Sequence, residues 1–320
     1  MTGIRTVLGD IDGFDGFAYM HEHLIIDSPL IADRFPDIHL YDVDAAVDEV
    51  SACREAGAAL MVDAMPASDG RDVVRLADVS RRSGVSIVVA TGLHHDRYYG
   101  PLHWSNRVDA DTLTELFVAD LVEGVDEFDY TSPVIRRTGH RAGIVKVATS
   151  GDTPDARDLR NIEAVAHASV ATGAPVLTHC EGGFGGVAQV ERLVAAGVPA
   201  SAIILSHVDK AQNLAYLRDL AETGAVLELD QSLREREEGT ASITVRAVLS
   251  LLADGFGDQI VLGTDGARRS LWSSLGGRPG LAWMARDFPG VLSEAGVSDG
   301  DIWKISHENA VRALTWREAS

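Results

Sequence analysis

Several histidines in this sequence stand where apolar stretches end, a pattern that can build a metal site. His21 and His23 flank Glu22 directly after the apolar run Phe17–Met20. Residues i and i+2 of an extended strand point to the same face, so both imidazoles can face one site while Glu22 turns away. Further apolar runs end in the other candidates, which are His179, His207 and Asp265. Four imidazoles and one carboxylate form a ligand set suited to zinc or a related divalent metal.

Lys146 lies within the apolar run Gly143–Val147, where burial of an unpaired ammonium would be costly. Burial lowers the pKa of a lysine, and the neutral amine can react with carbon dioxide to form a carbamate. Because a carbamate carries a negative charge and two oxygens, it can bridge two metal ions. The alternative is an ordinary buried ion pair with a carboxylate such as Glu228.

Each candidate also has an ordinary structural explanation. A single histidine at a strand end is commonly a hydrogen-bonded core residue, and a single aspartate there commonly caps the next helix. For these explanations to hold, five separate strands would need unrelated reasons for their polar residues. A shared metal site is therefore the favoured interpretation.

The candidates belong to a repeating pattern of short apolar runs and amphipathic segments. Eight runs of a kind typical of strands buried on both faces recur along the chain: Phe17–Met20, Ala59–Val62, Ile87–Ala90, Gly143–Val147, Pro175–Leu177, Ile203–Leu205, Ala225–Leu229 and Ile260–Leu262. Helical patterns lie between several of them, each followed by a glycine that can form a left-handed cap: Val43–Ala56, Asp72–Ser83, Asp158–Thr172, Val187–Ala196 and Gln212–Thr223.

Repeated strand–helix units indicate an α/β fold, either a barrel or a doubly wound sheet. Eight units, with polar residues where the apolar runs end, favour a (β/α)8 TIM barrel, whose active site lies at the carboxyl ends of its strands. Because no linker-like stretch divides the chain, we expect a single domain over residues 1–320. The long segment Leu93–Arg141 is expected to hold a loop, a helix and lid-like structure over the site, and Ala267–Pro289 is expected to have a similar role. A doubly wound nucleotide-binding fold is disfavoured, since no glycine fingerprint follows the first run.

Composition narrows the class of protein. A formal net charge of −20 and the lack of any run of Lys and Arg argue against nucleic acid as a partner and against binding to anionic membranes. No apolar run approaches the length of a membrane span, and Met1–Asp10 lacks the pattern of a secretion signal. Cys53 and Cys180 lie far apart, which argues against a disulfide framework. We therefore expect a soluble, cytoplasmic enzyme that acts on a small molecule.

At these residues the sequence resembles the phosphotriesterase-like group of the amidohydrolase superfamily. The resemblance rests on the order His-x-His, Lys, His, His, Asp on the first, fourth, fifth, sixth and eighth expected strands, and it covers essentially the whole chain. It implies a hydrolase with two divalent metal ions, expected to be zinc, and by analogy a homodimer. The implied metal ligands are His21, His23, Lys146, His179, His207 and Asp265. The more buried ion would take the first two histidines and Asp265, and the more exposed ion the other two histidines. Carbamylated Lys146 and a hydroxide would bridge the two ions.

The resemblance also implies a mechanism. Two cations a few ångströms apart lower the pKa of a bridging water, which gives a hydroxide nucleophile at neutral pH. Asp265 is the expected catalytic residue, since it would orient the hydroxide and carry its proton towards the leaving group.

Residues near the expected site point to an anionic substrate. Arg268 and Arg269 follow Asp265 in a stretch that looks like the eighth loop of the sugar-lactone-hydrolysing members, where arginines bind a substrate phosphate or carboxylate. The open alternative is that these arginines pair with acidic neighbours. His94 stands where that group usually has an aromatic residue, and Tyr98 could supply the ring instead.

We therefore expect a lactonase or esterase for a small anionic lactone, phosphorylated sugar lactones included, with phosphotriester cleavage as a side activity. The expected substrate-binding residues are Arg268, Arg269, Tyr98 and His94. One alternative is an amide hydrolase of small N-acyl compounds, which would use the same metals. Another is a non-catalytic barrel that binds small molecules; the presence of every candidate ligand counts against it.

Overall fold

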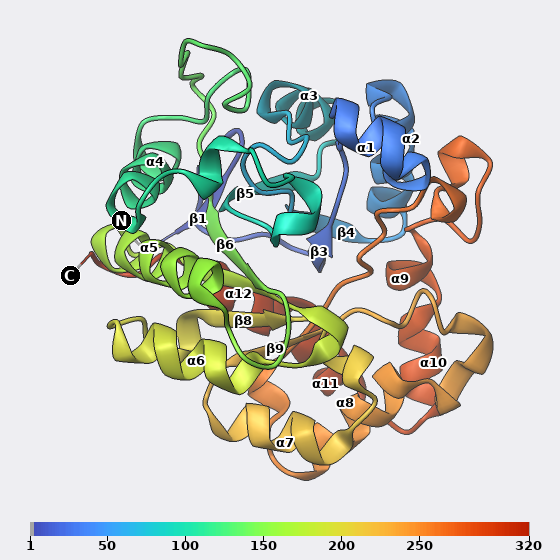
Figure 1. The fold of residues 1–320 in the computed structure, drawn as a ribbon. Helices are drawn as coiled ribbons and strands as arrows, with labels where there is room; N and C mark the ends of the chain where they lie inside the picture. Colours follow the sequence, from blue (N-terminus) through green and yellow to red (C-terminus); the bar gives the residue numbers. More distant parts are fainter. Residues whose placement is uncertain (1–2, 320) are drawn as a thin grey trace.

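The computed structural model describes residues 3–319, which form an eight-stranded parallel barrel surrounded by helices (Figure 1). The strands follow one another in chain order: β3 (Phe17–Glu22), β4 (Ala58–Asp63), β5 (Ser86–Gly92), β6 (Ile144–Thr149), β7 (Val176–Cys180), β8 (Ile203–Ser206), β9 (Val226–Leu229) and β10 (Ile260–Leu262). Each of the eight predicted runs falls on one of these strands, so the predicted α/β barrel is confirmed. Residues 1, 2 and 320 of the predicted domain lie outside the described residues.

Backbone hydrogen bonds just beyond β10 join the last strand to the first. The amide of Asp265 donates to the carbonyl of His21 at 2.9 Å, and the amide of Thr264 lies 3.4 Å from the same oxygen. Every other neighbouring pair of strands is joined by a parallel ladder. The sheet therefore closes on itself at the carboxyl ends of its strands.

The interior of the barrel is apolar towards the amino ends of the strands. Side chains on alternate strand positions meet there, as expected when successive residues point to opposite faces: Ala18, Met20, Leu60, Val62, Val88, Ala90, Ile144, Leu177, Ile204, Val226 and Val261. Ile4 and three residues of α12 (Asn309–Leu314) pack against this cluster and close the amino end. This apolar layer therefore supports the polar groups at the carboxyl ends of the strands.

Helices form an outer ring around the strands (Figure 1). They are α1 (Pro29–Arg34), α2 (Val43–Glu55), α3 (Val73–Ser83), α4 (Ala110–Val122), α5 (Ala156–Thr172), α6 (Gly186–Ala195), α7 (Leu214–Glu222), α8 (Ile243–Ala253), α9 (Trp283–Arg286), α10 (Phe288–Glu294), α11 (Asp299–Trp303) and α12, which follows a π-helical turn, Lys304–Glu308. Among the helices of residues 3–319, none is long and apolar enough to cross a membrane.

Two helix starts differ from the predictions by two residues, and capping explains both; the other predicted starts agree to within one residue. The helix predicted from Asp158 begins two residues earlier, because Asp155 caps it and exchanges hydrogen bonds with Asp158 in a capping box. The helix predicted from Gln212 begins at Leu214, because the side chain of Asn213 caps its first turn. The predicted glycine stops hold; Gly84, for example, caps α3 in the left-handed conformation with φ 72°.

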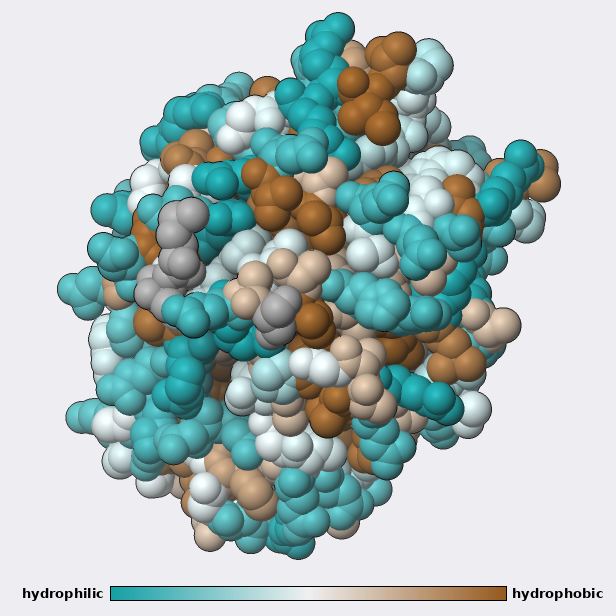
Figure 2. Space-filling view, turned by 90° about the vertical axis from the view of Figure 1, so that its left-hand side faces the viewer, coloured by the Kyte–Doolittle hydropathy of each residue, from teal (hydrophilic) through white to brown (hydrophobic). Residues whose placement is uncertain are grey.

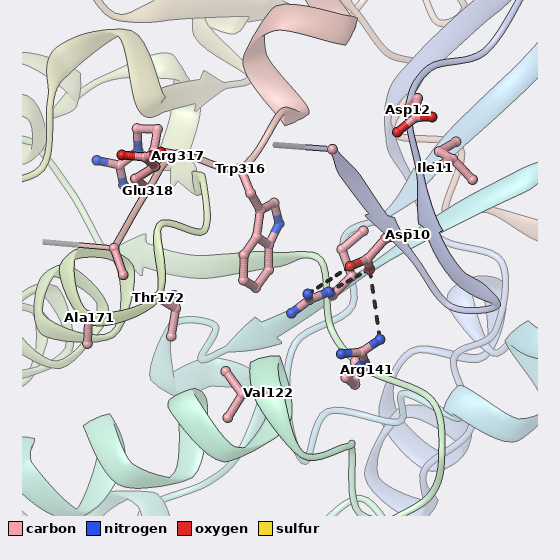
Figure 3. A pocket seen from close by; sticks show the side chains of 13 residues that line it. Asp10, Ile11, Asp12, Val122, Arg141, Ala171, Thr172, Trp316, Arg317 and Glu318 are labelled. Carbon is pink, nitrogen blue, oxygen red and sulfur yellow. Dashed lines mark hydrogen bonds and ion pairs between the residues drawn. The ribbon is translucent and has the colours of Figure 1, made fainter. Parts of the chain in front are cut away.

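A short hairpin of β1 (Ile4–Thr6) and β2 (Gly9–Ile11) lies at the amino end of the barrel together with the end of the chain, where Ile4 pairs with Thr315. Figure 2 shows this face, on which small groups of apolar residues alternate with hydrophilic ones. A cavity of about 680 Å³ opens between the two segments (Figure 3). Its arginine Arg5 is paired with Asp10 at 2.8 Å and lies 3.9 Å from the ring of Trp316. Arg5 is therefore occupied by Asp10 and Trp316, and the cavity lies far from the carboxyl ends of the strands.

The two long segments predicted to cover the site contain helices and short helical turns. Leu93–Arg141 contains two 3-10 turns, Asp96–Tyr98 and Trp104–Asn106, besides α4. Ala267–Pro289 contains the 3-10 turns Arg269–Leu271 and Ser273–Leu275 besides α9.

Glu49 of α2 holds the second of these segments in place. This fully buried carboxylate accepts hydrogen bonds from the hydroxyl of Ser273 (2.8 Å), the amide of Ser274 (2.9 Å) and the amide of Leu281 (2.6 Å). The loop that follows Asp265 is thus fixed to a helix more than two hundred residues away.

Replacing Glu49 by alanine is expected to lower the free energy of unfolding by about 2–4 kcal/mol, because two backbone amides would lose their partner in the interior. Urea unfolding followed by circular dichroism measures the effect. Asp48→Ala, an exposed acid beside it on the same helix, is the matched control and should change stability little. An equal, small change in both variants would show that Glu49 does not hold the loop.

Candidate metal and substrate site

The predicted ligand residues lie at the carboxyl ends of five strands. His21 is within β3 and His23 follows it; Lys146 is within β6 and His179 within β7. His207 follows β8 directly, with φ 66°, and Asp265 lies just beyond β10, with φ 45°. These left-handed conformations are uncommon for residues other than glycine and are typical of functional sites. The structure therefore brings all six predicted ligand residues to one end of the barrel.

The imidazoles form a contiguous group. The ring centres of His21 and His207 lie 4.5 Å apart, those of His179 and His207 4.6 Å, and those of His21 and His23 5.3 Å. One carboxylate oxygen of Asp265 is 3.7 Å from Nε2 of His23, and the other is 3.9 Å from Nδ1 of His207. His21, His23 and Asp265 each offer a ligand atom within 4.8 Å of the others, as the resemblance implied for the more buried ion.

Three of these histidines keep one ring nitrogen buried and unpaired within residues 3–319: Nε2 of His21, Nδ1 of His23 and Nδ1 of His179. An unpaired polar atom in the interior is costly, so each of these nitrogens calls for a partner. Burial lowers the pKa of His23 to about 3 and those of His21 and His179 well below their usual value. Neutral imidazoles with a free lone pair are the form that binds divalent metals, so the residues fit such ions.

The second nitrogen of three of the rings is held by an acid. Nδ1 of His21 lies 3.0 Å from Glu228, Nδ1 of His207 contacts Asp230, and Nε2 of His179 lies 2.7 Å from Glu181. Such carboxylates fix the orientation and tautomer of a metal-binding histidine. None of the three was given this role by sequence reasoning, although Glu228 and Asp230 lie at the end of an expected strand, where they could have been considered.

Lys146 is fully buried, and its ammonium donates a hydrogen bond to the carbonyl of Ala64 at 2.8 Å. Over the part of the chain that the structure describes, no carboxylate lies within ion-pair distance of it, and Glu228 is used by His21 instead. Burial lowers the pKa of Lys146 to about 8. The ordinary ion pair with Glu228 is therefore not formed, and burial favours the neutral amine more than in an exposed lysine.

Asp265 is clamped by two cations that sequence reasoning missed. Lys210 lies 3.2 Å and Arg234 3.1 Å from the same carboxylate oxygen, and Arg234 also donates to the carbonyl of Thr264 at 2.9 Å. Although burial alone would raise the pKa of Asp265, these cations hold it well below its ordinary value. The carboxylate is thus kept ionised. The only hint of this clamp in the sequence is that Lys210 stands three residues after the predicted ligand His207.

A cavity of about 330 Å³ opens above the histidines. Its apolar wall is made by Ile26, Ile31, Ile38 and Met65. Its other lining side chains include the ligands His23, His179, His207 and Asp265, together with Asp69, His94, Arg97, Tyr98, Glu181, Lys210, Arg234 and Arg268. A cleft with one apolar wall and many converging polar groups can hold a small polar molecule.

The structure brings three of the four predicted substrate-binding residues into this cavity. His94, Tyr98 and Arg268 line it. The guanidinium of Arg269 instead donates to the carbonyl of His39 at 3.0 Å and lies over the ring of Tyr41. Arg268 lies 3.6 Å from Asp37, and its side chain is 58% exposed. A role of these residues in binding substrate stays a prediction.

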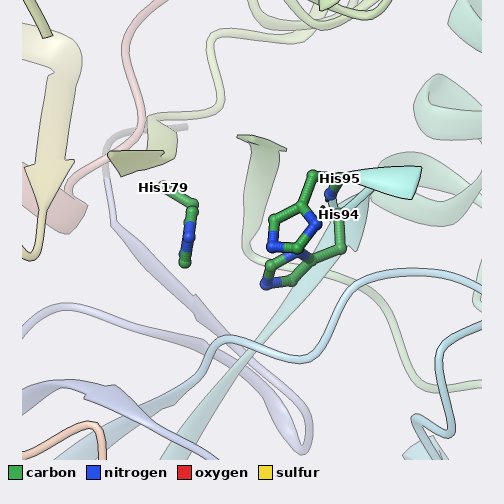
Figure 4. Close-up of side chains that lie close together, drawn as sticks. All are labelled: His94, His95 and His179. Atoms are coloured by element: carbon green, nitrogen blue, oxygen red, sulfur yellow. Dashed lines mark hydrogen bonds between the residues drawn. The ribbon is translucent and has the colours of Figure 1, made fainter. Parts of the chain in front are cut away.

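His94 and His95, from the loop after β5, lie beside His179 of β7 (Figure 4). The ring centre of His179 is 4.7 Å from that of His94 and 5.4 Å from that of His95. Nε2 of His95 is buried and 3.6 Å from Glu181, the same acid that orients His179. This side of the cavity is therefore lined by imidazoles. The group that the sequence resembles usually has a bulky aromatic residue here.

Comparisons with known proteins agree with this geometry. The family model of the phosphotriesterase family matches residues 2–314. A phospho-furanose lactonase of Mycoplasmopsis synoviae is 29% identical over 325 residues, which cover 98% of this chain and 92% of the relative.

Two solved structures have the same fold. An amidohydrolase from Mycoplasma synoviae superposes with a TM-score of 0.93 at 27% identity, over 100% of this chain and 93% of the other. A lactonase from Listeria monocytogenes superposes with a TM-score of 0.88 at 27% identity, over 99% of this chain and 100% of the other. Since the family model spans nearly all of the sequence, this chain belongs to the phosphotriesterase family, whose members are hydrolases.

Proposed function

We propose that this protein is a binuclear metal-dependent lactonase for small anionic lactones, phosphorylated sugar lactones included. The observation that carries the proposal is the joint presence of the unpaired imidazole nitrogens and a small cavity whose lining includes the cations Arg97 and Arg268, besides Lys210 and Arg234, which pair with Asp265. The similarity to a phospho-furanose lactonase supports the substrate class. Zinc as the metal, a homodimer and a cytoplasmic location belong to the same proposal; the last agrees with two free, buried cysteines.

In this proposal the ligand residues divide as the resemblance implies. His21, His23 and Asp265 would hold the more buried ion and His179 and His207 the more exposed one, with carbamylated Lys146 between them. When bound, such ions supply Lewis acidity that polarises the substrate carbonyl and makes water a better nucleophile. Glu228, Asp230 and Glu181 keep the rings in position through their second nitrogens.

Asp265 is the proposed proton carrier. Its ionised carboxylate can accept a proton from the attacking water and deliver it to the ring oxygen as the ester bond of the lactone breaks. The product is then a single hydroxy acid, which carries both the new carboxyl group and the new hydroxyl group. No covalent enzyme intermediate is needed. Lys210 and Arg234 hold the carboxylate in place for both transfers.

A substrate panel tests the function. Phosphorylated and neutral lactones, small N-acyl amides and a phosphotriester are assayed side by side on the metal-loaded enzyme. We expect the highest kcat/KM for the phosphorylated lactones and only weak phosphotriester cleavage. A highest kcat/KM for N-acyl amides would favour the amide hydrolase instead, and turnover of none of these compounds would overturn the proposal.

Metal content is expected to be about two ions per chain after growth with zinc and bicarbonate. Lys146→Ala and His207→Ala should each lose most of the bound metal and activity, because each removes a ligand that the ions need. Elemental analysis and lactone hydrolysis measure this. His167→Ala, which changes an exposed histidine of α5, is the control. Full metal content in Lys146→Ala would show that the lysine is not a ligand.

Arg268→Ala is expected to raise KM for phosphorylated lactones about tenfold or more and to leave neutral lactones nearly unchanged, because the guanidinium would pair with the phosphate. Steady-state kinetics on matched phosphorylated and neutral lactones measure the difference. Arg269→Ala is the matched control, since Arg269 points to His39 outside the cavity. Equal effects of both variants, or equal effects on both substrates, would remove the proposed role of Arg268.

A further inference from the structure

Asp69 is a buried acid on the wall of the substrate cavity, in the loop after β4. Asp69 is only 1% exposed, and neither of its carboxylate oxygens has a hydrogen-bond partner among residues 3–319. Asp63, at the end of the same strand, behaves differently: its oxygens accept from the amides of Leu24 (2.7 Å) and Met65 (3.1 Å). Asp63 therefore has an evident structural role, whereas Asp69 has none.

The backbone on both sides of Asp69 is fixed. Ser68 has a left-handed φ of 61°, and its hydroxyl donates to the carbonyl of Asp129 at 2.9 Å. The carbonyl of Gly70 accepts from the amide of Asp27 at 2.8 Å, and a Cβ at Gly70 would come within 2.8 Å of that nitrogen. Strained and tightly held backbone of this kind is typical of functional sites. The position of Asp69 on the cavity wall is therefore built into the loop.

An unpartnered carboxyl in the interior costs free energy unless a ligand supplies the missing hydrogen bonds. Burial raises the pKa of Asp69 well above its ordinary value, although the charge of Lys146 opposes the rise. A neutral carboxyl offers both a hydrogen-bond donor and an acceptor. A hydroxyl group, which also donates and accepts, is its natural complement.

The rest of the cavity narrows the choice of substrate group for this acid. The anionic part of the substrate is matched by the cations that share the cavity, Arg97 and Arg268, and an acid would not attract it. Met65 and the isoleucine side chains of the wall offer no hydrogen bond. A polar, uncharged substituent of the substrate therefore remains as the group that Asp69 can recognise.

We propose that Asp69 forms a hydrogen bond with a ring hydroxyl of the substrate, so that the enzyme selects hydroxylated lactones over their deoxygenated counterparts. This inference rests on the proposed lactonase function and assigns Asp69 as the residue that sets this specificity. A site built to pair a hydroxyl rejects the analogue that lacks it, because its own polar group is then left buried and unpaired.

The test combines a change in the substrate with a change in the protein. A phosphorylated pentonolactone with its ring hydroxyls is compared with the dideoxy counterpart that lacks them, so that the phosphate stays constant. Wild-type enzyme is expected to have a kcat/KM about 100-fold higher for the hydroxylated lactone. Asp69→Leu should remove most of this preference by lowering kcat/KM for the hydroxylated lactone alone, whereas Asp69→Asn, which still donates and accepts, should keep much of it.

Controls separate recognition from folding. Met65→Leu changes another lining side chain and should affect both lactones alike. Metal content should stay at the wild-type level in each variant used, and the melting temperature should not fall below it. Equal kcat/KM for the two lactones in wild-type enzyme would overturn the inference, and so would an equal loss on both lactones in Asp69→Leu. The wild-type comparison decides the matter even if Asp69→Leu does not fold.

The two proposals can fail separately. If wild-type enzyme hydrolyses neither lactone, the proposed function fails. Calorimetry then measures binding of the two hydroxy acids that correspond to the ring-opened lactones, which tests Asp69 alone. Tighter binding of the hydroxylated acid by wild type than by Asp69→Leu supports the contact, and equal binding overturns it. A preference for a lactone that carries an ammonium group would also overturn the inference, because it would indicate an ion pair with Asp69.

Discussion

The carbonyl of His21 accepts a hydrogen bond from the backbone amide of Asp265, and this bond joins the first strand of the barrel to the last. It closes the sheet, and it also sets the carboxylate of Asp265 opposite the His-x-His pair. Glu22, which turns away from the site as predicted, strengthens the junction by accepting from the amide (2.9 Å) and the hydroxyl (2.6 Å) of Thr264. The fold and the metal site therefore depend on the same contact, so the relative position of these ligands is not left to loops.

A layer of acids beneath the imidazoles converts this framework into an oriented site. Asp230 contacts His207, and its backbone amide donates to Asp209 at 3.2 Å. Asp209 also accepts from the amide of Gln231 at 3.0 Å and the hydroxyl of Thr244 at 2.7 Å. Burial would raise the pKa of Asp230, but His207 and Lys210 lower it to about 2. Buried charges of this kind are costly unless they are fully paired. Their presence is explained by the need to orient the ligands, not by stability.

The sequence predicted the strands and the ligand set because both depend on local patterns. Apolar runs, glycine stops and the order of polar strand ends can be found along the chain without knowing any contact. The clamp on Asp265 could not be found in this way, since Lys210 and Arg234 approach it from two other loops. The direction of Arg269 was also beyond the pattern, because the 3-10 turn that starts there carries it towards His39. Asp69 has no local signal, since its importance lies in the partners that it lacks.

Charge and hydrogen bonding contribute differently to selection in this cavity. Lys210 and Arg234 are committed to Asp265, so the anionic substrate depends on cations such as Arg268, whose side chain is more than half exposed. Water and salt screen an exposed charge strongly, so it attracts anions in general and distinguishes little between them. Asp69 is shielded from water, where a missing hydrogen bond is most costly. Arg268 should therefore favour capture of anions, whereas discrimination between similar lactones should depend on the buried acid.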